Sequence, residues 1–171
     1  MNNIKSSMYN FIFIHGAQGT GKTTLARLLK EKLDTVCIDF DWLRGFHLNA
    51  TWTNASETEE VMSIENLALL LKNYAKHDYK NVIIGGFPKK ILDYLGEYKS
   101  IVFTLYLTDD EILKQRVLTG TRDSGFRDYA TSIEWNKKFR DALHFPEERK
   151  IDSTHQTPEE TVNHMIALIN G

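Results

Sequence analysis

The stretch from Gly16 to Thr23 has the residue types and the spacing of a phosphate-binding loop. It satisfies the pattern G-x-x-x-x-G-K-[ST], in which glycines let the backbone approach phosphate closely with its amide groups turned inward. We expect Lys22 to reach the outer phosphates of a nucleoside triphosphate and the Thr23 hydroxyl to bind Mg²⁺. The predicted nucleotide-binding residues are Gly16, Ala17, Gln18, Gly19, Thr20, Gly21, Lys22, Thr23 and Thr24.

The surroundings of this loop are those that the chemistry requires. Residues 9–14 form a short apolar run typical of a buried strand. After the loop, leucines recur at helical spacing at Leu25, Leu28, Leu29 and Leu33. The loop therefore joins a strand to an amphipathic helix, whose amino-terminal dipole favours the same anion. This context separates the motif from a chance glycine turn.

Composition limits the class of protein. The chain has 171 residues, a formal net charge of −2 and a pI near 6.3, which describe one domain spanning 1–171 without a basic bias toward nucleic acid. Its one cysteine, Cys37, excludes an internal disulfide and reads as a small buried side chain. We find no apolar run long enough to cross a membrane and no signal peptide, so we expect a cytoplasmic protein.

Apolar strands alternate with helices along the whole chain. Four further strands are predicted at residues 35–38, 82–84, 101–107 and around 150–151, and apolar spacing predicts helices over 61–74 and 162–169. Strands separated by helices favour parallel crossovers and a sheet that is covered on both faces. The sequence therefore predicts a single three-layer α/β/α domain.

Four pairs of residues have the spacing of a helix capping box, in which Ser or Thr is followed three residues later by Glu. The pairs are Ser56/Glu59, Thr108/Glu111, Thr131/Glu134 and Thr157/Glu160, and Pro158 follows the last Thr at the first helical position. Each pair predicts the start of a helix.

Ligands of parallel α/β sheets bind beyond the carboxyl ends of the strands, which makes the residues there the functional candidates. The second strand leads into Asp39 and Asp41. We expect one of the two carboxylates to hold Mg²⁺ through water and the other to accept a proton from an attacking hydroxyl, and the catalytic role is favoured for Asp41. Arg44 lies one helical turn after Asp41 and could bind an anionic group of the substrate. The alternative is that Asp39 or Asp41 caps a helix and that Arg44 faces water.

Two later segments complete the shortlist. Gly85 and Gly86 end the third strand and allow close approach of a substrate, or form an ordinary turn. Residues 119–130 are polar, bounded by glycine and rich in arginine. We predict that they form a lid in which Arg122 and Arg127 neutralise the migrating phosphoryl group and help to exclude water. The alternative is a solvated loop.

At this point the chain resembles the P-loop kinases of nucleotides and small metabolites, the group that includes shikimate, gluconate and adenylate kinases and chloramphenicol phosphotransferase. The resemblance implies five parallel strands in the order 2-3-1-4-5. Asp39 and Asp41 resemble the Asp-x-Asp of shikimate kinases, which implies that Asp39 assists Mg²⁺ and that Asp41 contacts the accepting hydroxyl. Arg116 matches an arginine that stacks on adenine in this group. The segment from Gly85 to Lys89 is similar to the Asp-Gly-Phe-Pro-Arg of adenylate kinases, but lacks its acid and its arginine.

We predict a phosphotransferase that moves the γ-phosphoryl group of Mg-ATP to a hydroxyl of a small metabolite or nucleoside-like acceptor. One alternative is a polynucleotide 5′-hydroxyl kinase, whose Asp-x-x-Arg resembles Asp41 and Arg44, although the acidic pI disfavours nucleic acid. A second alternative is a nucleotide-dependent switch or binding module. Such proteins usually carry an acid at the end of the third strand, where this chain has Gly85 and Gly86.

Overall fold

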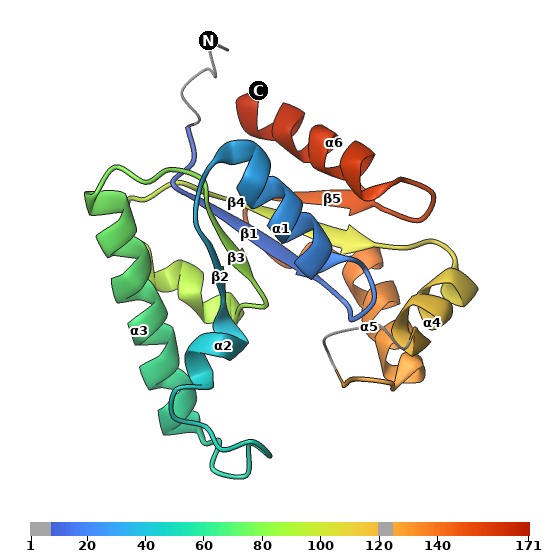
Figure 1. Cartoon of the computed structure of the whole chain (residues 1–171), viewed down its shortest axis with the longest axis horizontal. Helices are drawn as coiled ribbons and strands as arrows, with labels where there is room; N and C mark the ends of the chain where they lie inside the picture. The colour runs from blue at the N-terminus through green and yellow to red at the C-terminus, as the bar shows by residue number, and fades with distance from the viewer. Residues whose placement is uncertain (1–7, 120–124) are drawn as a thin grey trace.

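The computed structural model describes residues 8–119 and 125–171, and these contain a five-stranded parallel sheet in the order β2-β3-β1-β4-β5 (Figure 1). The strands are β1 (Phe11–Gly16), β2 (Cys37–Asp39), β3 (Val82–Gly85), β4 (Ser100–Tyr106) and β5 (Glu148–Asp152). The helices are α1 (Lys22–Leu33), α2 (Phe40–Arg44), α3 (Glu57–Lys76), the 3-10 helix η1 (Lys89–Tyr94), α4 (Asp110–Leu118), α5 (Tyr129–Asp141) and α6 (Pro158–Asn170). The predicted fold and strand order are confirmed.

Helices cover both faces of the sheet. On one face, α1 and α6 pack on the side chains that alternate along β1 and β4, such as Ile12, Ile14 and Phe103 (Figure 1). On the other face, α3 and η1 pack on the remaining side chains, such as Phe11 and Phe13. Burial of a side chain of this size stabilises the fold by about 1.5–3 kcal/mol, so the two cores hold the strands in place.

The central strand carries the phosphate-binding loop to the middle of the sheet edge. Residues Phe11 to Ile14 of β1 are fully buried because the strand lies between β3 and β4 and has helices on both faces. The apolar run predicts this strand over 9–14, whereas the structure has it over Phe11–Gly16. It continues to Gly16 because that residue still pairs with Leu105 of β4. β3 lies on one side of β1 and β4 on the other, so the strand order reverses at β1. Ligands of such sheets bind at this switch point, beyond the carboxyl ends of the strands.

α3 is the predicted long amphipathic helix, and it has 20 residues. Ile64, Leu67, Ala68 and Leu71 are buried on its inner side, as their spacing predicts. Across residues 8–119 and 125–171, the structure has no helix whose length and apolar character would let it cross a membrane.

The predicted helix caps are only partly correct. The Thr157/Glu160 box is confirmed with both of its hydrogen bonds and with Pro158 at the helix start. Ser56 caps α3, but the Glu59 side chain does not return to it. The other two predictions are wrong. Asp109, next to Thr108, accepts the amides at the start of α4, and Asp128, three residues before Thr131, accepts the Thr131 amide at the start of α5.

Replacing Thr157 by Ala should lower the free energy of unfolding by about 1 kcal/mol, because the Glu160 amide loses its acceptor. Urea unfolding measures this difference. Thr157→Ser is the matched control: it keeps the oxygen and should stay close to the unmodified protein. An equal loss in both variants would show that the methyl group, and not the cap, is responsible.

Candidate active site

The phosphate-binding loop leaves β1 through backbone that only glycine adopts easily. Gly16 and Gly19 have φ angles of +139° and +88°. A Cβ atom on Gly16 would lie 2.5 Å from the Leu105 carbonyl oxygen, and one on Gly19 would lie 2.8 Å from a Val117 methyl group. Glycine is therefore required at positions 16 and 19 by the neighbouring strand and helix, whatever the loop binds.

Side chains from elements distant in the sequence hold the backbone of the loop. The Ser132 hydroxyl of α5 donates to the Gln18 carbonyl, and the Ser153 hydroxyl donates to the Thr20 carbonyl at 3.3 Å. Within the loop, Thr20 Oγ1 donates to the Ala17 carbonyl at 2.8 Å. These bonds hold three carbonyl groups and so fix the loop's shape without help from a ligand, which lowers the cost of binding one. Ser132 was missed from the sequence, where nothing marks it.

The Lys22 ammonium group lies within the phosphate-binding loop. Lys22 Nζ donates to the Gly16 carbonyl at 2.8 Å and to the Ala17 carbonyl at 2.9 Å. Lys22 is also the first residue of α1, and exposed Thr23 and Thr24 follow it in a first turn without acidic side chains. The ammonium group, the helix dipole and the amides of this turn place positive potential at one point, which suits a phosphate chain.

Asp39 and Asp41 lie at the carboxyl end of β2, which is separated from β1 by β3, at the point where β2 passes into α2. Asp39 caps α2, since its Oδ1 accepts the Asp41 amide at 2.9 Å. Within the described residues, the Asp41 carboxylate has no hydrogen-bond or ion-pair partner. Surrounding protein removes part of its hydration and raises its pKa, Asp39 adds to the rise, and Arg44 and Lys22 oppose it. Asp41 is thus an available proton acceptor that senses the Lys22 charge.

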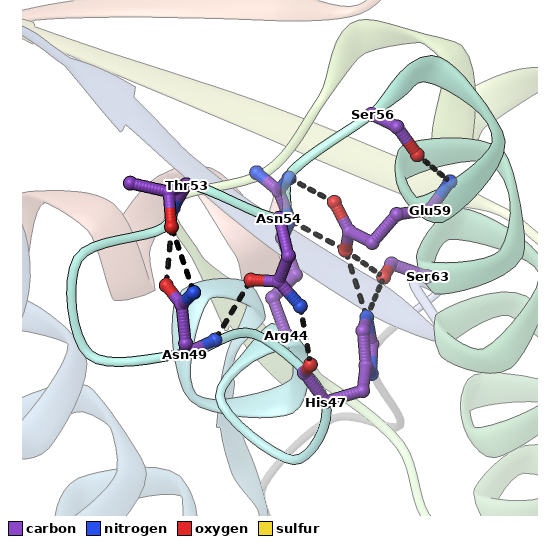
Figure 2. A network of polar contacts seen from close by, with 8 residues as sticks. All are labelled: Arg44, His47, Asn49, Thr53, Asn54, Ser56, Glu59 and Ser63. Carbon is purple, nitrogen blue, oxygen red and sulfur yellow. Dashed lines mark hydrogen bonds and ion pairs between the residues drawn. The ribbon is translucent and has the colours of Figure 1, made fainter.

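Arg44 does not project freely from α2 but is held by Glu59 of α3 (Figure 2). Arg44 Nε donates to Glu59 Oε1 at 3.0 Å, and a second guanidinium nitrogen reaches Oε2. Ser63 Oγ donates to Oε1 at 2.7 Å, and His47 Nε2 lies 2.8 Å from the same oxygen. The hydrogen bonds from Arg44 are the main reason that the pKa of Glu59 falls to about 2. One carboxylate thus joins α2, the loop after it and α3.

The connection between α2 and α3 has its own hydrogen bonds (Figure 2). Asn54 Nδ2 donates to the His47 carbonyl at 3.0 Å, and the Asn49 amide donates to Asn54 Oδ1 at 2.9 Å. Asn49 Nδ2 donates to Thr53 Oγ1 at 2.8 Å. These bonds shape the wall of the site next to Asp41.

Gly85, the last residue of β3, and Gly86 after it leave space beside the aspartates. Gly85 pairs with Asp39 in the sheet register. Among the described residues, no atom lies within 4 Å of a Cβ added at Gly85 or Gly86. The structure therefore brings Gly85, a predicted acceptor-binding residue, next to Asp39 at the end of β2.

The predicted arginines differ in how they are placed. Arg116 of α4 donates to the Ser153 and Thr154 carbonyls, both at 3.2 Å, and burial lowers its pKa. Arg127 is exposed just before α5, where one guanidinium nitrogen donates to the Phe126 carbonyl at 2.9 Å. Since α5 reaches the loop through Ser132, Arg127 is attached to an element that contacts the phosphate site. Arg122 lies outside the described residues.

His15 was also missed, although it immediately precedes the loop. Its ring packs against Phe139 and Phe145, with centroids 4.3 and 4.8 Å away. Burial, assisted by the nearby Lys22 charge, lowers its pKa to about 4. His15 is therefore neutral at pH 7 and adds no charge behind the loop.

With this geometry established, the sequence can be compared with known families. The pattern that defines the AAA domain family matches residues 12–137, from β1 into α5. This match covers most of the chain, including the phosphate-binding loop and the segment from Asp39 to Arg44. The chain belongs to the AAA domain family.

Individual proteins resemble this AAA domain over nearly its whole length. A Pyrococcus abyssi (strain GE5 / Orsay) protein named "Putative adenylate kinase" is 27% identical, covering 94% of this chain and 84% of that protein. The structure of a sugar kinase from Janibacter sp. HTCC2649 has a TM-score of 0.65 at 16% identity over 93% of both chains. Shikimate kinase from Acinetobacter baumannii, solved with shikimate, has a TM-score of 0.63 at 20% identity over 94% and 93% of the two chains. The resemblance of this AAA domain to the P-loop kinases is confirmed in fold.

Replacing Glu59 by Gln should lower the free energy of unfolding at pH 7 by about 2 kcal/mol, the scale of lost charged hydrogen bonds. Because folding lowers the pKa of Glu59 from its ordinary 4.5 to about 2, its contribution is complete above pH 4.5 and is lost as the pH falls toward 2. Urea unfolding between pH 2.5 and 7 should therefore show the two curves converging at low pH. A constant difference would contradict the ionic role of Glu59.

Proposed function

We propose that this AAA domain transfers the γ-phosphoryl group of Mg-ATP to a hydroxyl of a small metabolite or nucleoside-like acceptor. The observation that carries the proposal is the position of Asp41. Its carboxylate has no partner among the described residues, and it lies close enough to Lys22 for the ammonium charge to lower its pKa. A hydroxyl group between Asp41 and a phosphate chain on the loop would meet both a proton acceptor and an electrophile.

The nucleotide side of the site is supplied by the loop residues Gly16 to Thr24. Loop amides and Lys22 bind the phosphates, and Arg116 borders the base, as the resemblance to P-loop kinases implies. The residues present fit Mg²⁺: Thr23 exposes its hydroxyl, and one Asp39 oxygen makes no hydrogen bond within residues 8–119 and 125–171. Bound there by Thr23 and, through water, by Asp39, Mg²⁺ would neutralise charge on the β- and γ-phosphates.

On the acceptor side, Asp41 orients the hydroxyl and accepts its proton as the oxygen bonds to the γ-phosphorus. The bond between that phosphorus and the bridging β-oxygen breaks, and ADP leaves with the electron pair. Arg127 and Arg122, the predicted lid arginines, stabilise the charge of the migrating group. Gly85 and Gly86 leave room for the acceptor beside the two aspartates.

The comparisons support a small acceptor. The solved structures with this fold include a sugar kinase and a shikimate kinase, whose names describe hydroxyl-bearing small molecules. The Pyrococcus abyssi relative is named after adenylate kinase, which favours a nucleotide on at least one side of the reaction. An acceptor of this class suits the unpartnered Asp41 carboxylate.

ADP release from Mg-ATP should be measured with nucleosides, sugars, shikimate, aminoglycosides and 5′-hydroxyl oligonucleotides. Stimulation by one class of small acceptor would support the proposal and name the substrate type. Stimulation by the oligonucleotide alone would favour the polynucleotide kinase. Slow hydrolysis without stimulation, together with demonstrated ATP binding, would contradict a kinase and favour a nucleotide-dependent switch.

Replacing Lys22 by Ala should reduce kcat/KM for ATP by about 10²–10³-fold, because a preorganised charge on the phosphates is lost. The fold should persist, since Lys22 is the first residue of α1 and is not one of the buried residues of that helix. The control is Lys30→Ala, an exposed position on the same helix. Steady-state kinetics and circular dichroism check both expectations, and normal turnover of Lys22→Ala would sink the assignment.

Replacing Asp41 by Asn should reduce acceptor-dependent transfer by about 10²–10⁴-fold, the usual contribution of a general base. Binding of Mg-ATP should change little. Calorimetry with a non-hydrolysable analogue, beside ADP release, separates the two effects, and exposed Asp93→Asn is the control. Equal losses of binding and transfer would instead make Asp41 a structural or metal-holding residue.

A further inference from the structure

The Arg44 guanidinium is bound along one edge by a carboxylate and lies near two aromatic rings. Glu59 binds the edge through two nitrogens (Figure 2). The Trp52 ring covers the guanidinium with its centroid 4.8 Å away, and the Phe40 ring lies at 5.9 Å. Only 14% of the Arg44 side chain and 8% of the Glu59 side chain are exposed. This is the geometry of a closed ion pair, and not of a cation available to bind an anion. We call the surface formed by Arg44, Trp52 and Glu59 the α2–α3 wall.

The charge next to this wall is negative. The charges of Arg44 and Glu59 cancel one another. Asp39 at the end of β2 and Asp41 in α2 add two negative charges on the side of the phosphate-binding loop. An acceptor with a phosphate or carboxylate directed at α2 would meet these two carboxylates. To reach Arg44 it would have to displace Glu59, which also binds Ser63 and lies against His47. An uncharged hydroxyl compound meets neither obstacle.

Resting on the proposed function, we infer that the acceptor is uncharged where it meets the α2–α3 wall, and that Glu59 determines this specificity by occupying Arg44. Glu59 acts through Arg44 and is a positioning residue. The acceptor class is then a free hydroxyl compound, such as a nucleoside or a sugar, and not its phosphate ester. The Arg44 role predicted from the sequence, binding of an anionic substrate group, would appear only if Glu59 were neutralised.

The first experiment tests the wall without requiring phosphoryl transfer. The protein is saturated with Mg²⁺ and a non-hydrolysable ATP analogue so that the loop is filled, and inorganic phosphate is then titrated by calorimetry. Glu59→Gln should bind phosphate about tenfold more tightly than the unmodified protein, since the guanidinium regains an open edge. The double variant Glu59→Gln with Arg44→Gln should lose this gain. Glu60→Gln, which removes the adjacent exposed carboxylate, is the matched control and should bind as the unmodified protein does.

Two results of this titration would overturn the inference. One is phosphate binding by the unmodified protein that Glu59→Gln weakens, because the ion pair would then be part of an anion site. The other is a folded Glu59→Gln variant, verified by its thermal transition, with unchanged phosphate affinity. Both are independent of catalysis, so a protein that transfers nothing would contradict the proposed function alone.

The second experiment uses the unmodified protein and does not depend on the folding of a variant. Transfer from Mg-ATP is compared for matched acceptors, adenosine with AMP and glucose with glucose 6-phosphate. For the acceptor that is used, kcat/KM should be about tenfold or more higher for the uncharged member. A preference for the phosphorylated member would overturn the inference while leaving the kinase intact.

Discussion

The close approach of two neighbouring strands at Gly16 is the constraint on which the site depends. β1 keeps its pairing with β4 up to Gly16, the residue where the loop begins. Because the strands are so close there, a Cβ atom on Gly16 would lie 2.5 Å from the Leu105 carbonyl oxygen. The loop therefore starts from the buried central strand of the sheet. The Ser132 and Ser153 hydroxyls then bond to its carbonyls from two other parts of the chain. The conformation of this glycine-rich loop is thus fixed by contacts with the surrounding protein.

The parts of the structure that are visible in the sequence are those encoded by neighbouring residues. The apolar run before Gly16, the loop motif and the leucine spacing of α1 belong to one continuous segment, and their prediction is confirmed. The strand order came from a family resemblance and is confirmed too. The caps show the limit of this approach. Thr108 and Asp109 compete for the same amides, and the aspartate caps α4 while Thr108 bonds with Thr154. Residue spacing alone does not decide between two adjacent acceptors.

Glu59 shows how a correct local pattern can conceal a distant partner. The pair Ser56/Glu59 predicts a capping box, and Ser56 does cap α3. The Glu59 carboxylate instead binds Arg44, which is 15 residues earlier and across a loop. The exchange is favourable because a guanidinium offers two charged hydrogen bonds, whereas the box offers one neutral amide. The position of Arg44 in an ion pair could not be predicted without knowing how the loop folds back.

Asp41 of α2 and Glu59 of α3 are acids in opposite environments, and their pKa values shift in opposite directions. Glu59 receives hydrogen bonds from Arg44 and Ser63, and its pKa falls. Asp41 receives none within the described residues, loses part of its hydration and has a raised pKa. A raised pKa means that ionised Asp41 opposes folding at neutral pH, whereas ionised Glu59 favours it. A purely structural acid at position 41 would gain from pairing with Arg44 one turn away, yet Glu59 holds that arginine. The fold thus leaves the exposed Asp41 carboxylate without a partner among the described residues, which is the environment that the proposed proton acceptor requires.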